Sequence, residues 1–429
     1  MEEIKMKYSD YSAYFAPVVT KETDIVVQSA KGIWITDVDG NKYMDFVQGI
    51  AVNALGHCFE TVVRAIQEQA ANIIHASLNI VSYPATMEFA KRLSESTPGS
   101  LNVSFFSNGG AEAVDGALKL AKIATGRPGI IAFRGSFHGR TIGATSITGS
   151  KARYRKHLEP LMPSVYFSGY PYYFHRDIDL SEAEYAERRL AELREIISYT
   201  IDPSDVAAII VEPVQGEGGY IVPHPEFLSG LREICDKNGI LLIFDEIQSG
   251  FGRTGKMWAS QHFGIIPDIM TAGKAIAGGL PMSAIISSKE IMDKWERGTH
   301  GTTFGGNPVC AAAGLAVLDA LQGEVLENCR IQGDYLSERL KELKDKHPVV
   351  GDVRGLGLMK AIEFVEPGTR TPNPAAMSKV ILAARKKGLL LLSCGIFQNT
   401  IRLAPPLNIT RDELDQALET IDSCIGFAV

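Results

Sequence analysis

The sequence lacks several features that would place it in a specialised class of protein. Its six cysteines form no CxxC pair, which argues against a disulfide scaffold or a zinc ribbon and fits reduced, mostly buried thiols. It contains no HExxH or GxSxG motif and no paired Cys/His spacing, so metal-hydrolase and serine-hydrolase hypotheses have no motif support. With 43 Lys and Arg against 50 Asp and Glu, the chain as a whole is not a nucleic-acid-binding polycation.

Long apolar runs are also missing. The longest, GLLLLSC at 388–394, has the length of a strand, well below the ~20 residues that span a bilayer. The first eight residues, MEEIKMKY, contain no apolar core of a secretory signal. We therefore expect a soluble, cytoplasmic protein with no membrane or nucleic-acid partner. Its 429 residues allow two or three domains, or one large α/β unit with an appendage.

Short apolar runs alternate with amphipathic helical stretches through the middle of the chain. The strand-like runs lie at 103–106, 129–133, 206–211, 240–244 and 282–286. The helix-like stretches between them lie at 111–124, 181–199 and 225–237. This alternation predicts a doubly wound α/β domain with a mostly parallel sheet.

The two ends of the chain differ from the middle. Residues 24–46 have alternating polarity around the turn sequence DVDGN, which predicts a hairpin. A long helical stretch from about 311 leads into an α+β region with a strand-like segment at 400–403 and a helix near 410–427. The predicted units are an N-terminal segment 1–54 that contributes to the small domain, a large domain 55–315 and a small C-terminal domain 316–429.

One glycine-rich segment imitates two nucleotide-binding motifs. GFGRTG at 250–255 matches GxGxxG, and 250–256 also fits GxxxxGK. Four residues separate the segment from the end of the preceding strand, no helix pattern follows it, and Met257 replaces the Ser or Thr of a P-loop. A glycine-rich active-site or interface loop is the better interpretation.

Two other segments could contact a phosphate. Small residues at 107–113 follow a predicted strand and open a predicted helix, where backbone N–H groups and the helix dipole favour an anion. An ordinary glycine-rich turn explains them equally well. The loop 301–308 carries two threonines before a helix, and its hydroxyls could reach a phosphate, although this signal is weak alone.

Asp245 and Lys274 are the candidate reactive residues. Asp245 ends the apolar run 240–244, and a carboxylate buried there needs a cationic partner such as a protonated pyridine nitrogen. Lys274 stands among small residues in AGKAIAGG, which leaves room for a bulky ring beside a partly desolvated amine. A structural ion pair for Asp245 and a surface position for Lys274 are the alternatives for each residue taken alone.

Together, these motifs resemble the class III (ω-) pyridoxal-phosphate aminotransferases over almost the whole chain, from about residue 33 onward. The stretches that carry the resemblance are DVDGNKYMDFVQGIAV, NGGAEAVDGALKLAK, FHGRT, VEPVQGEGG, FDEIQSGFGRTGK, GKAIAGGLPMSA, TTFGGNP, GDVRGLG, LLSCG and IRLAPPL. The members that the chain resembles most are bacterial 4-aminobutyrate aminotransferases. The resemblance implies fold type I, pyridoxal 5′-phosphate as cofactor, and a homodimer with shared active sites, with pairing of dimers into tetramers left open.

The resemblance also implies how the cofactor ring is held. Lys274 binds the cofactor's aldehyde carbon and acts as general base, and Asp245 pairs with the pyridine nitrogen. Gln248 faces the phenolic oxygen, and Ile247 packs beneath the ring.

Five further residues are implied around the cofactor. Gly110 and Ala111 give backbone N–H groups to the phosphate, where many relatives carry a Ser or Thr hydroxyl at the Ala111 position. Phe137 stacks on the ring, and His138 orients its loop. Thr303 reaches the phosphate bound by the neighbouring subunit.

For the substrates, the resemblance implies two arginines and a removable counter-charge. Arg140 takes the distal carboxylate, and Arg402 takes the α-carboxylate of glutamate or 2-oxoglutarate. Glu217 pairs with Arg402 when no α-carboxylate is present, since an unpaired buried charge is costly. Glu212 supports this network from behind, and Ile50 forms an apolar wall.

Three alternatives to a 4-aminobutyrate-type transaminase stay open. An acetylornithine or ornithine aminotransferase shares Lys274, Asp245 and Arg140. An amino-acid racemase or 2-epimerase keeps the same cofactor residues, but Glu217 favours the transaminase. Non-catalytic binding is disfavoured because each cofactor-binding residue type is in place. The resemblance assigns no role to the basic, aromatic stretch 150–175, which we expect to lie at an interface or at the pocket entrance.

Overall fold

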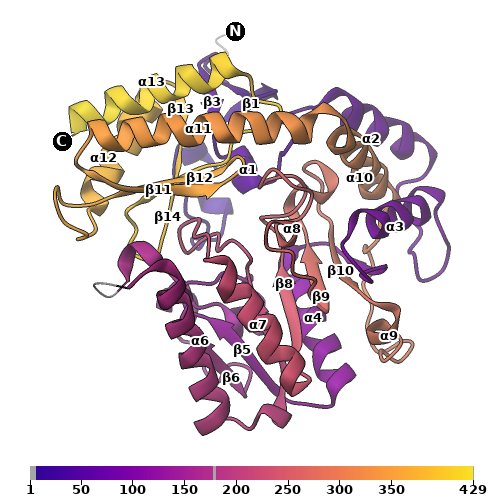
Figure 1. The fold of residues 1–429 in the computed structure, drawn as a ribbon. Helices are drawn as coiled ribbons and strands as arrows, with labels where there is room; N and C mark the ends of the chain where they lie inside the picture. The colour runs from indigo at the N-terminus through magenta and orange to yellow at the C-terminus, as the bar shows by residue number, and fades with distance from the viewer. Residues whose placement is uncertain (1–5, 177–179, 429) are drawn as a thin grey trace.

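The computed structural model of the chain describes residues 6–176 and 180–428. The first five residues, which bear on the expected absence of a secretory signal, lie outside the described residues. The largest sheet has seven strands (Figure 1). From edge to edge they are β4 (Val103–Ser107), β10 (Ser283–Ser287), β9 (Ile269–Ala272), β8 (Leu241–Asp245), β7 (Val206–Val211), β5 (Gly129–Phe133) and β6 (Val165–Ser168).

This sheet is parallel except for one strand. β6, β5, β7, β8 and β9 pair in parallel, whereas β10 is antiparallel to both of its neighbours, β9 and β4. The apolar runs predicted as strands correspond to β4, β5, β7, β8 and β10, which confirms the mostly parallel sheet. β6 and β9, each of four residues, were not predicted from the sequence.

Helices cover both faces of the sheet. Successive residues of β5 alternate between the faces: Ile130 packs in the cluster of α4, and Ile131 packs in the cluster of α6 and α7. The helices on the first face are α4 (Gly110–Thr125), α5 (Ile142–Ile147) and α9 (Lys289–Met292). Those on the other face are α6 (Glu182–Tyr199), which begins with a capping box at Ser181, and α7 (Pro225–Asn238).

A second sheet joins the two ends of the chain. Its order is β1 (Val27–Lys31), β2 (Trp34–Asp37), β3 (Lys42–Asp45) and β13 (Leu389–Leu390). The predicted hairpin is confirmed as β2 and β3, whose turn is held by Asp37 Oδ1 accepting the N–H groups of Asp39 and Asn41 at 2.9 and 2.8 Å. β3 pairs in parallel with β13, so residues from both chain ends share one sheet. The boundaries after residues 54 and 315 stay predictions.

The C-terminal region adds a third sheet and long helices. The sheet order is β11 (Val350–Leu356), β12 (Met359–Phe364), β15 (Thr400–Leu403) and β14 (Leu392–Cys394). α11 (Leu326–Lys346) and α13 (Arg411–Ala428) run side by side beyond this sheet, in orange and yellow in Figure 1. The remaining helices are α1 (Gln48–Ala51), α2 (Glu60–Asn72), α3 (Pro84–Ser96), α8 (Ser260–Phe263), α10 (Pro308–Ala320) and α12 (Pro374–Lys386).

α10 and α11 meet at a π-helical turn, Leu321–Val325, in which Gly323 departs from helical geometry with φ −89° and ψ −143° and kinks the chain. By length and composition alone, the stretch Pro308–Lys346 is one helix among the described residues that could cross a membrane, which the short apolar runs of the sequence did not suggest. Its apolar residues in α10, including Ala313 and Val317, lie in the core, and α10 packs on α2 and α3. Burial in this core accounts for the apolar composition of α10.

Candidate active site

A cavity of about 210 Å³ lies at the carboxyl edge of the seven-stranded sheet. Its residues follow five parallel strands, β4, β5, β7, β8 and β9, whose carboxyl ends meet at one edge. The residues that line it are Gly110, Ala111, Phe137, His138, Gly139, Glu212, Asp245, Ile247, Gln248 and Lys274. All of them except Gly139 are residues that the sequence singled out, so the fold gathers segments separated by up to about 160 positions.

Asp245 is the buried anion of this cavity. It ends β8 with 4% of its surface exposed, and His138 Nδ1 lies 2.7 Å from its Oδ2. Its Oδ1 accepts hydrogen bonds from the Ile247 N–H at 3.1 Å and the Thr271 hydroxyl at 3.2 Å. Burial lowers the pKa of His138, but the hydrogen bond and charge of Asp245 outweigh burial and raise it overall. His138 therefore contacts the carboxylate directly, beyond the loop-orienting role expected for it.

Lys274 is the amine of the cavity. It follows β9 at the start of a 3-10 turn, Lys274–Ala277, and its φ of +47° is a backbone conformation that non-glycine residues seldom adopt. Burial lowers its pKa, while the charge of Asp245 opposes that shift. Among the described residues, no carboxylate lies within ion-pairing distance of the Lys274 amine. A buried amine without an ion pair is suited to nucleophilic or base chemistry.

The N-terminus of α4 faces the same cavity. Gly109, its N-cap residue, makes no side-chain capping bond, so the first N–H groups of the helix have no side-chain acceptor. Gly110 and Ala111 begin the helix and line the cavity. An uncapped helix N-terminus of this length is a site for an anion such as a phosphate.

Apolar and amide side chains form the walls. A Cβ atom at Gly110 would lie 3.0 Å from Ile247 Cδ1, and one at Gly273 would lie 3.2 Å from Ile247 Cγ2, so a side chain at either position would crowd Ile247. The Gln248 Oε1 atom accepts a hydrogen bond from the Tyr220 hydroxyl at 2.9 Å. Phe137 meets Tyr154 edge to face, with ring centres 5.9 Å apart.

Glu212 braces the backbone around the cavity. Its Oε1 accepts the Phe137 N–H at 2.9 Å, and its Oε2 accepts the Gly216 N–H at 2.8 Å. Burial, with the charge of Asp245, raises the pKa of Glu212 to about 7, while the charge of His138 and both backbone bonds act in the opposite direction. Because Gly216 directly precedes Glu217, Glu212 fixes the start of the turn that carries Glu217.

Glu217 and Arg402 form an ion pair next to this turn. Arg402 Nη2 lies 2.8 Å from Glu217 Oε2, and its Nε and Nη2 also donate to the Ser393 carbonyl at 3.1 and 2.8 Å. Burial raises the pKa of Glu217, but the charges of Arg402 and Lys151 outweigh burial and lower it overall. The glutamate is therefore ionised and masks a buried guanidinium.

Arg140, the other arginine singled out, has a different environment. It is exposed, and its guanidinium carbon lies 4.3 Å from the centre of the Tyr154 ring, a cation–π contact. It pairs with no carboxylate among the described residues. Arg140 is thus positioned by an aromatic face while its hydrogen-bond donors stay available.

Besides Arg140, Glu217 and Arg402, two further predicted residues, Thr303 and Ile50, lie outside the cavity lining. Thr303 is exposed in the loop between α9 and α10, next to Phe304, which is 59% exposed. Ile50 is 46% exposed in α1, where its φ of +67° breaks the helix. The structure brings neither of them to the cavity of its own chain.

The structure also places residues at the site that the sequence did not single out. Lys151 pairs with Glu217, Tyr154 contacts both Phe137 and Arg140, and Tyr220 holds Gln248. Lys151 and Tyr154 lie in the basic, aromatic stretch 150–175. No local spacing marks them, because their partners lie tens of residues away along the chain.

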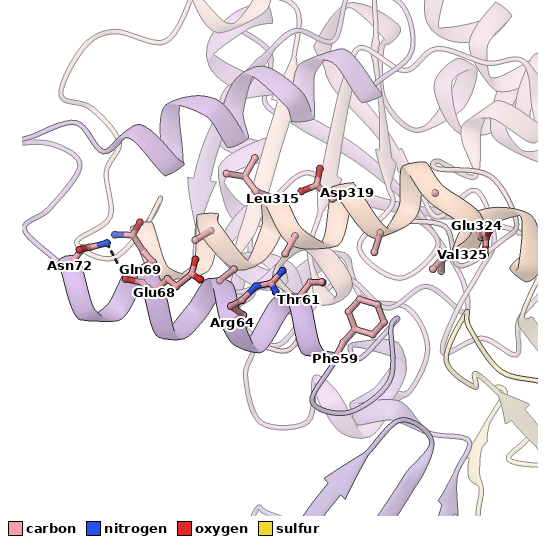
Figure 2. Close-up of a pocket in the computed structure, with 15 residues that line it drawn as sticks. Phe59, Thr61, Arg64, Glu68, Gln69, Asn72, Leu315, Asp319, Glu324 and Val325 are labelled. Atoms are coloured by element: carbon pink, nitrogen blue, oxygen red, sulfur yellow. Dashed lines mark hydrogen bonds between the residues drawn. The ribbon is translucent and has the colours of Figure 1, made fainter.

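A larger concavity of about 750 Å³ lies elsewhere, between α2 and α10 (Figure 2). Its labelled side chains include Arg64, Glu68 and Asp319, and its lining contains no lysine and none of the predicted site residues. Volume alone therefore does not identify the functional site, whereas the convergence of Lys274, Asp245 and an uncapped helix does.

A family model matches nearly the whole chain. The model described as aminotransferase class-III matches residues 15–425.

Three characterised relatives are similar in sequence. A 5-aminovalerate aminotransferase of Pseudomonas putida is 39% identical over 94% of this chain and 93% of its own length. A 4-aminobutyrate aminotransferase of Escherichia coli is 38% identical over 94% of both chains. An isoleucine 2-epimerase of Lentilactobacillus buchneri is 37% identical over 93% of this chain and 89% of its own length. The similarity thus extends to relatives with two kinds of reaction.

Solved structures agree with this similarity. An amine transaminase from an uncultivated Pseudomonas species, solved in a pyridoxal-phosphate-bound form, is 32% identical and matches with a TM-score of 0.89 over 97% of this chain and 98% of its own. An (S)-enantioselective ω-transaminase from Thermomicrobium roseum is also 32% identical, with a TM-score of 0.92 over 98% of both chains.

Proposed function

Because the chain belongs to the class III aminotransferase family and is a pyridoxal-phosphate-dependent aminotransferase, we propose that it transfers the amino group of an ω-amino acid to 2-oxoglutarate. The proposed donor is 4-aminobutyrate or a close homologue such as 5-aminovalerate. This matches the printed activities of two of the similar enzymes.

The cavity fits the cofactor at three points. Asp245 is a buried carboxylate whose nearest cation is a histidine, so a pyridinium nitrogen would complete its pairing. The uncapped start of α4 at Gly110 and Ala111 would hold the phosphate, and Phe137 and Ile247 would enclose the ring. When bound, pyridoxal phosphate supplies an electron sink for the carbon that carries the amino group.

The chain's own residues supply proton transfer and orientation. Lys274 Nζ would hold the cofactor's aldehyde carbon and then, once the substrate amine replaces it, accept the proton from the substrate carbon. Burial lowers the pKa of this amine, a shift in the direction that favours its unprotonated form. Asp245, held by His138, would keep the ring nitrogen protonated, and Gln248, held by Tyr220, would face the phenolic oxygen.

The observation that carries the substrate assignment is the Glu217–Arg402 pair. An ω-amino acid has no carboxylate at the reacting carbon, so Glu217 would stay on Arg402 and spare a buried, unpaired guanidinium. Glutamate and 2-oxoglutarate have a carboxylate there, which would displace Glu217. Arg140 would hold the distal carboxylate of both kinds of substrate by a bidentate contact.

Two substrates that use one pocket in turn imply a ping-pong sequence. The ω-amino acid would bind first, give up its amino group and leave as an aldehyde acid. 2-Oxoglutarate would then bind the same pocket, with Glu217 displaced, and leave as glutamate.

The placement of Thr303 supports a dimeric active unit. Thr303 lies on an exposed loop away from its own chain's cavity, as a residue that serves a neighbouring subunit would. We therefore propose a homodimer in which the Thr303 hydroxyl binds the phosphate of the second site. The proposed location is the cytoplasm.

The second candidate is an amino-acid racemase or 2-epimerase. It is favoured by the similarity to isoleucine 2-epimerase. Such an enzyme would reprotonate the substrate carbon on its opposite face, instead of moving the proton to the cofactor. Its substrates always carry an α-carboxylate, however, and a removable mask on Arg402 would have no purpose.

An end-point assay tests the proposal. Holoenzyme incubated with 4-aminobutyrate or 5-aminovalerate and 2-oxoglutarate is expected to form glutamate, with Lys274→Ala as the background control. Interconversion of L-isoleucine with its 2-epimer, with no glutamate from either donor, would establish the second candidate instead.

A further inference from the structure

The carboxylate of Glu217 is held by two cations at once. Lys151 Nζ lies 2.7 Å from Oε1, and Arg402 Nη2 lies 2.8 Å from Oε2. The three side chains are largely enclosed, with 16% of Lys151, 14% of Glu217 and 7% of Arg402 exposed. Because each cation uses a different oxygen, one contact can break while the other remains.

Lys151 belongs to the basic, aromatic stretch 150–175. It directly precedes a 3-10 turn, Ala152–Tyr154, and its amine lies 5.9 Å from the centre of the Tyr154 ring. The Arg140 guanidinium lies over the same ring at 4.3 Å. The turn therefore connects the Glu217–Arg402 pair with the second arginine proposed to bind a carboxylate.

The double contact changes the energetics of unmasking Arg402. Two cations held by one carboxylate repel each other, so the positive charge of Lys151 offsets part of the attraction that Glu217 exerts on Arg402. A carboxylate left with no partner at this depth would carry the desolvation penalty of a buried charge. Lys151 thus weakens the hold of Glu217 on Arg402 and also keeps Glu217 paired after Arg402 has been released.

We propose that Lys151 is a specificity-determining positioning residue that retains Glu217 by Oε1 while a substrate α-carboxylate displaces Oε2 from Arg402. The inference rests on the masking role of Glu217 in the proposed function. Lys151 touches no substrate; it acts through Glu217. Its loss therefore weakens ligands that have two carboxylates and spares ligands that have one.

Calorimetry on the holoenzyme tests this role without catalysis. The probes are glutarate, which has a carboxylate at each end of a five-carbon chain, and valerate, which has one. Lys151→Met is expected to weaken glutarate binding about ten-fold or more and to leave valerate binding unchanged or slightly tighter. Lys151→Arg should restore glutarate binding. Lys156→Met removes an exposed lysine of the same stretch and should change neither affinity.

A double-mutant cycle distinguishes this role from direct contact with the ligand. In a Glu217→Ser background, Lys151→Met is expected to have no further effect on glutarate, because its route of action is gone. If Lys151→Met weakens glutarate binding as strongly in the Glu217→Ser background as in the wild type, Lys151 binds the ligand itself and the proposal is overturned. Equal losses for glutarate and valerate, or an unchanged glutarate affinity in Lys151→Met alone, would also overturn it.

The same experiments separate this proposal from the proposed function. If Lys151→Met weakens glutarate binding as expected but the wild type forms no glutamate, the substrate assignment is contradicted and the role of Lys151 is supported. A wild type that forms glutamate, but whose glutarate affinity does not depend on Lys151, would contradict only the role of Lys151.

Discussion

At the scale of single residues, the proposed substrate choice depends on one carboxylate. Glu217 lies 2.8 Å from Arg402 and, in the proposed function, is the group that a substrate α-carboxylate would replace. The formal net charge of −7 says nothing about this, because the charges that matter are local ones.

Glu217→Ser should therefore impair the half-reaction of the ω-amino acid more than the half-reaction of glutamate. Without the mask, an ω-amino acid must bring its apolar carbon chain against an unpaired guanidinium, whereas glutamate supplies its own carboxylate. We expect kcat/KM for 4-aminobutyrate to fall about ten-fold or more and kcat/KM for glutamate to change little. Single-turnover kinetics with each amino donor measure the two values separately, and equal losses would refute the masking role.

Glu212 makes the folding stability of the apoprotein depend on pH, and its raised pKa sets the direction of that dependence. Its pKa in the folded chain is about 7, above the ordinary 4.5, so its stabilising contribution is full below pH 4.5 and is lost as pH rises through 7. The difference between the two pKa values corresponds to about 3 kcal/mol in the free energy of unfolding. Between pH 5 and pH 8, the melting temperature of the wild-type apoprotein should thus fall more than that of Glu212→Gln. Parallel pH profiles for the two proteins would contradict the raised pKa.

At the scale of secondary-structure elements, Arg354 ties β11 to the turn that carries Glu217. Its Nε donates to the Gly219 carbonyl at 2.9 Å, and its Nη1 lies 2.8 Å from Asp352 and 2.6 Å from Glu363, which is fully buried. Tyr172 completes the cluster with hydrogen bonds to both Arg354 and Glu363. The motif GDVRGLG thus anchors the turn that carries Glu217.

Arg354→Met should destabilise this junction strongly. Removing one partner of a buried charge pair costs about 3–5 kcal/mol, because Glu363 stays buried with fewer partners. Arg330→Met is the matched control: Arg330 pairs with Glu327 on α11 but is 56% exposed, so its loss should cost less than about 1 kcal/mol. Thermal melts of both variants check the contrast, and similar melting temperatures would contradict the account of the junction.

The sequence predicted these elements where side-chain patterns are long and local. Apolar runs identified five strands of the large sheet, and the predicted helix 181–199 corresponds to α6, whose start the structure shows to be a capping box at Ser181 and Glu184. β6 was missed because it lies within the basic, aromatic stretch 150–175, where no apolar run stands out, and β9 was missed as well. For the site, the resemblance to class III aminotransferases supplied most of the cavity residues, and the fold brings them together because the carboxyl ends of parallel strands meet at one edge. Lys151 was not predicted as a site residue because its contact with Glu217 spans 66 positions and leaves no local sequence pattern.

At the scale of the whole molecule, the proposed unit is a pair of chains. Thr303 is exposed, and the cavity of its own chain lacks it. If Thr303 serves the neighbouring site, defects at Lys274 and Thr303 belong to different sites even when they lie on one chain.

Subunit complementation tests this arrangement. Lys274→Ala and Thr303→Arg homodimers should both be impaired. A heterodimer made from one chain of each has both defects in one site and none in the other, so activity should rise well above that of either parent. Mixed subunits with no gain over the parents, despite verified heterodimers, would place Thr303 at its own chain's site.

The central claim is that one pocket accepts an ω-amino acid and glutamate in separate half-reactions. The most direct measurement follows the cofactor absorption of the wild-type holoenzyme after each amino donor is added without an acceptor. We predict that 4-aminobutyrate or 5-aminovalerate, and also L-glutamate, convert the cofactor to its amine form, and that 2-oxoglutarate restores the original spectrum. A cofactor that keeps its original form with all three donors, while L-isoleucine is converted to its 2-epimer, would contradict the claim.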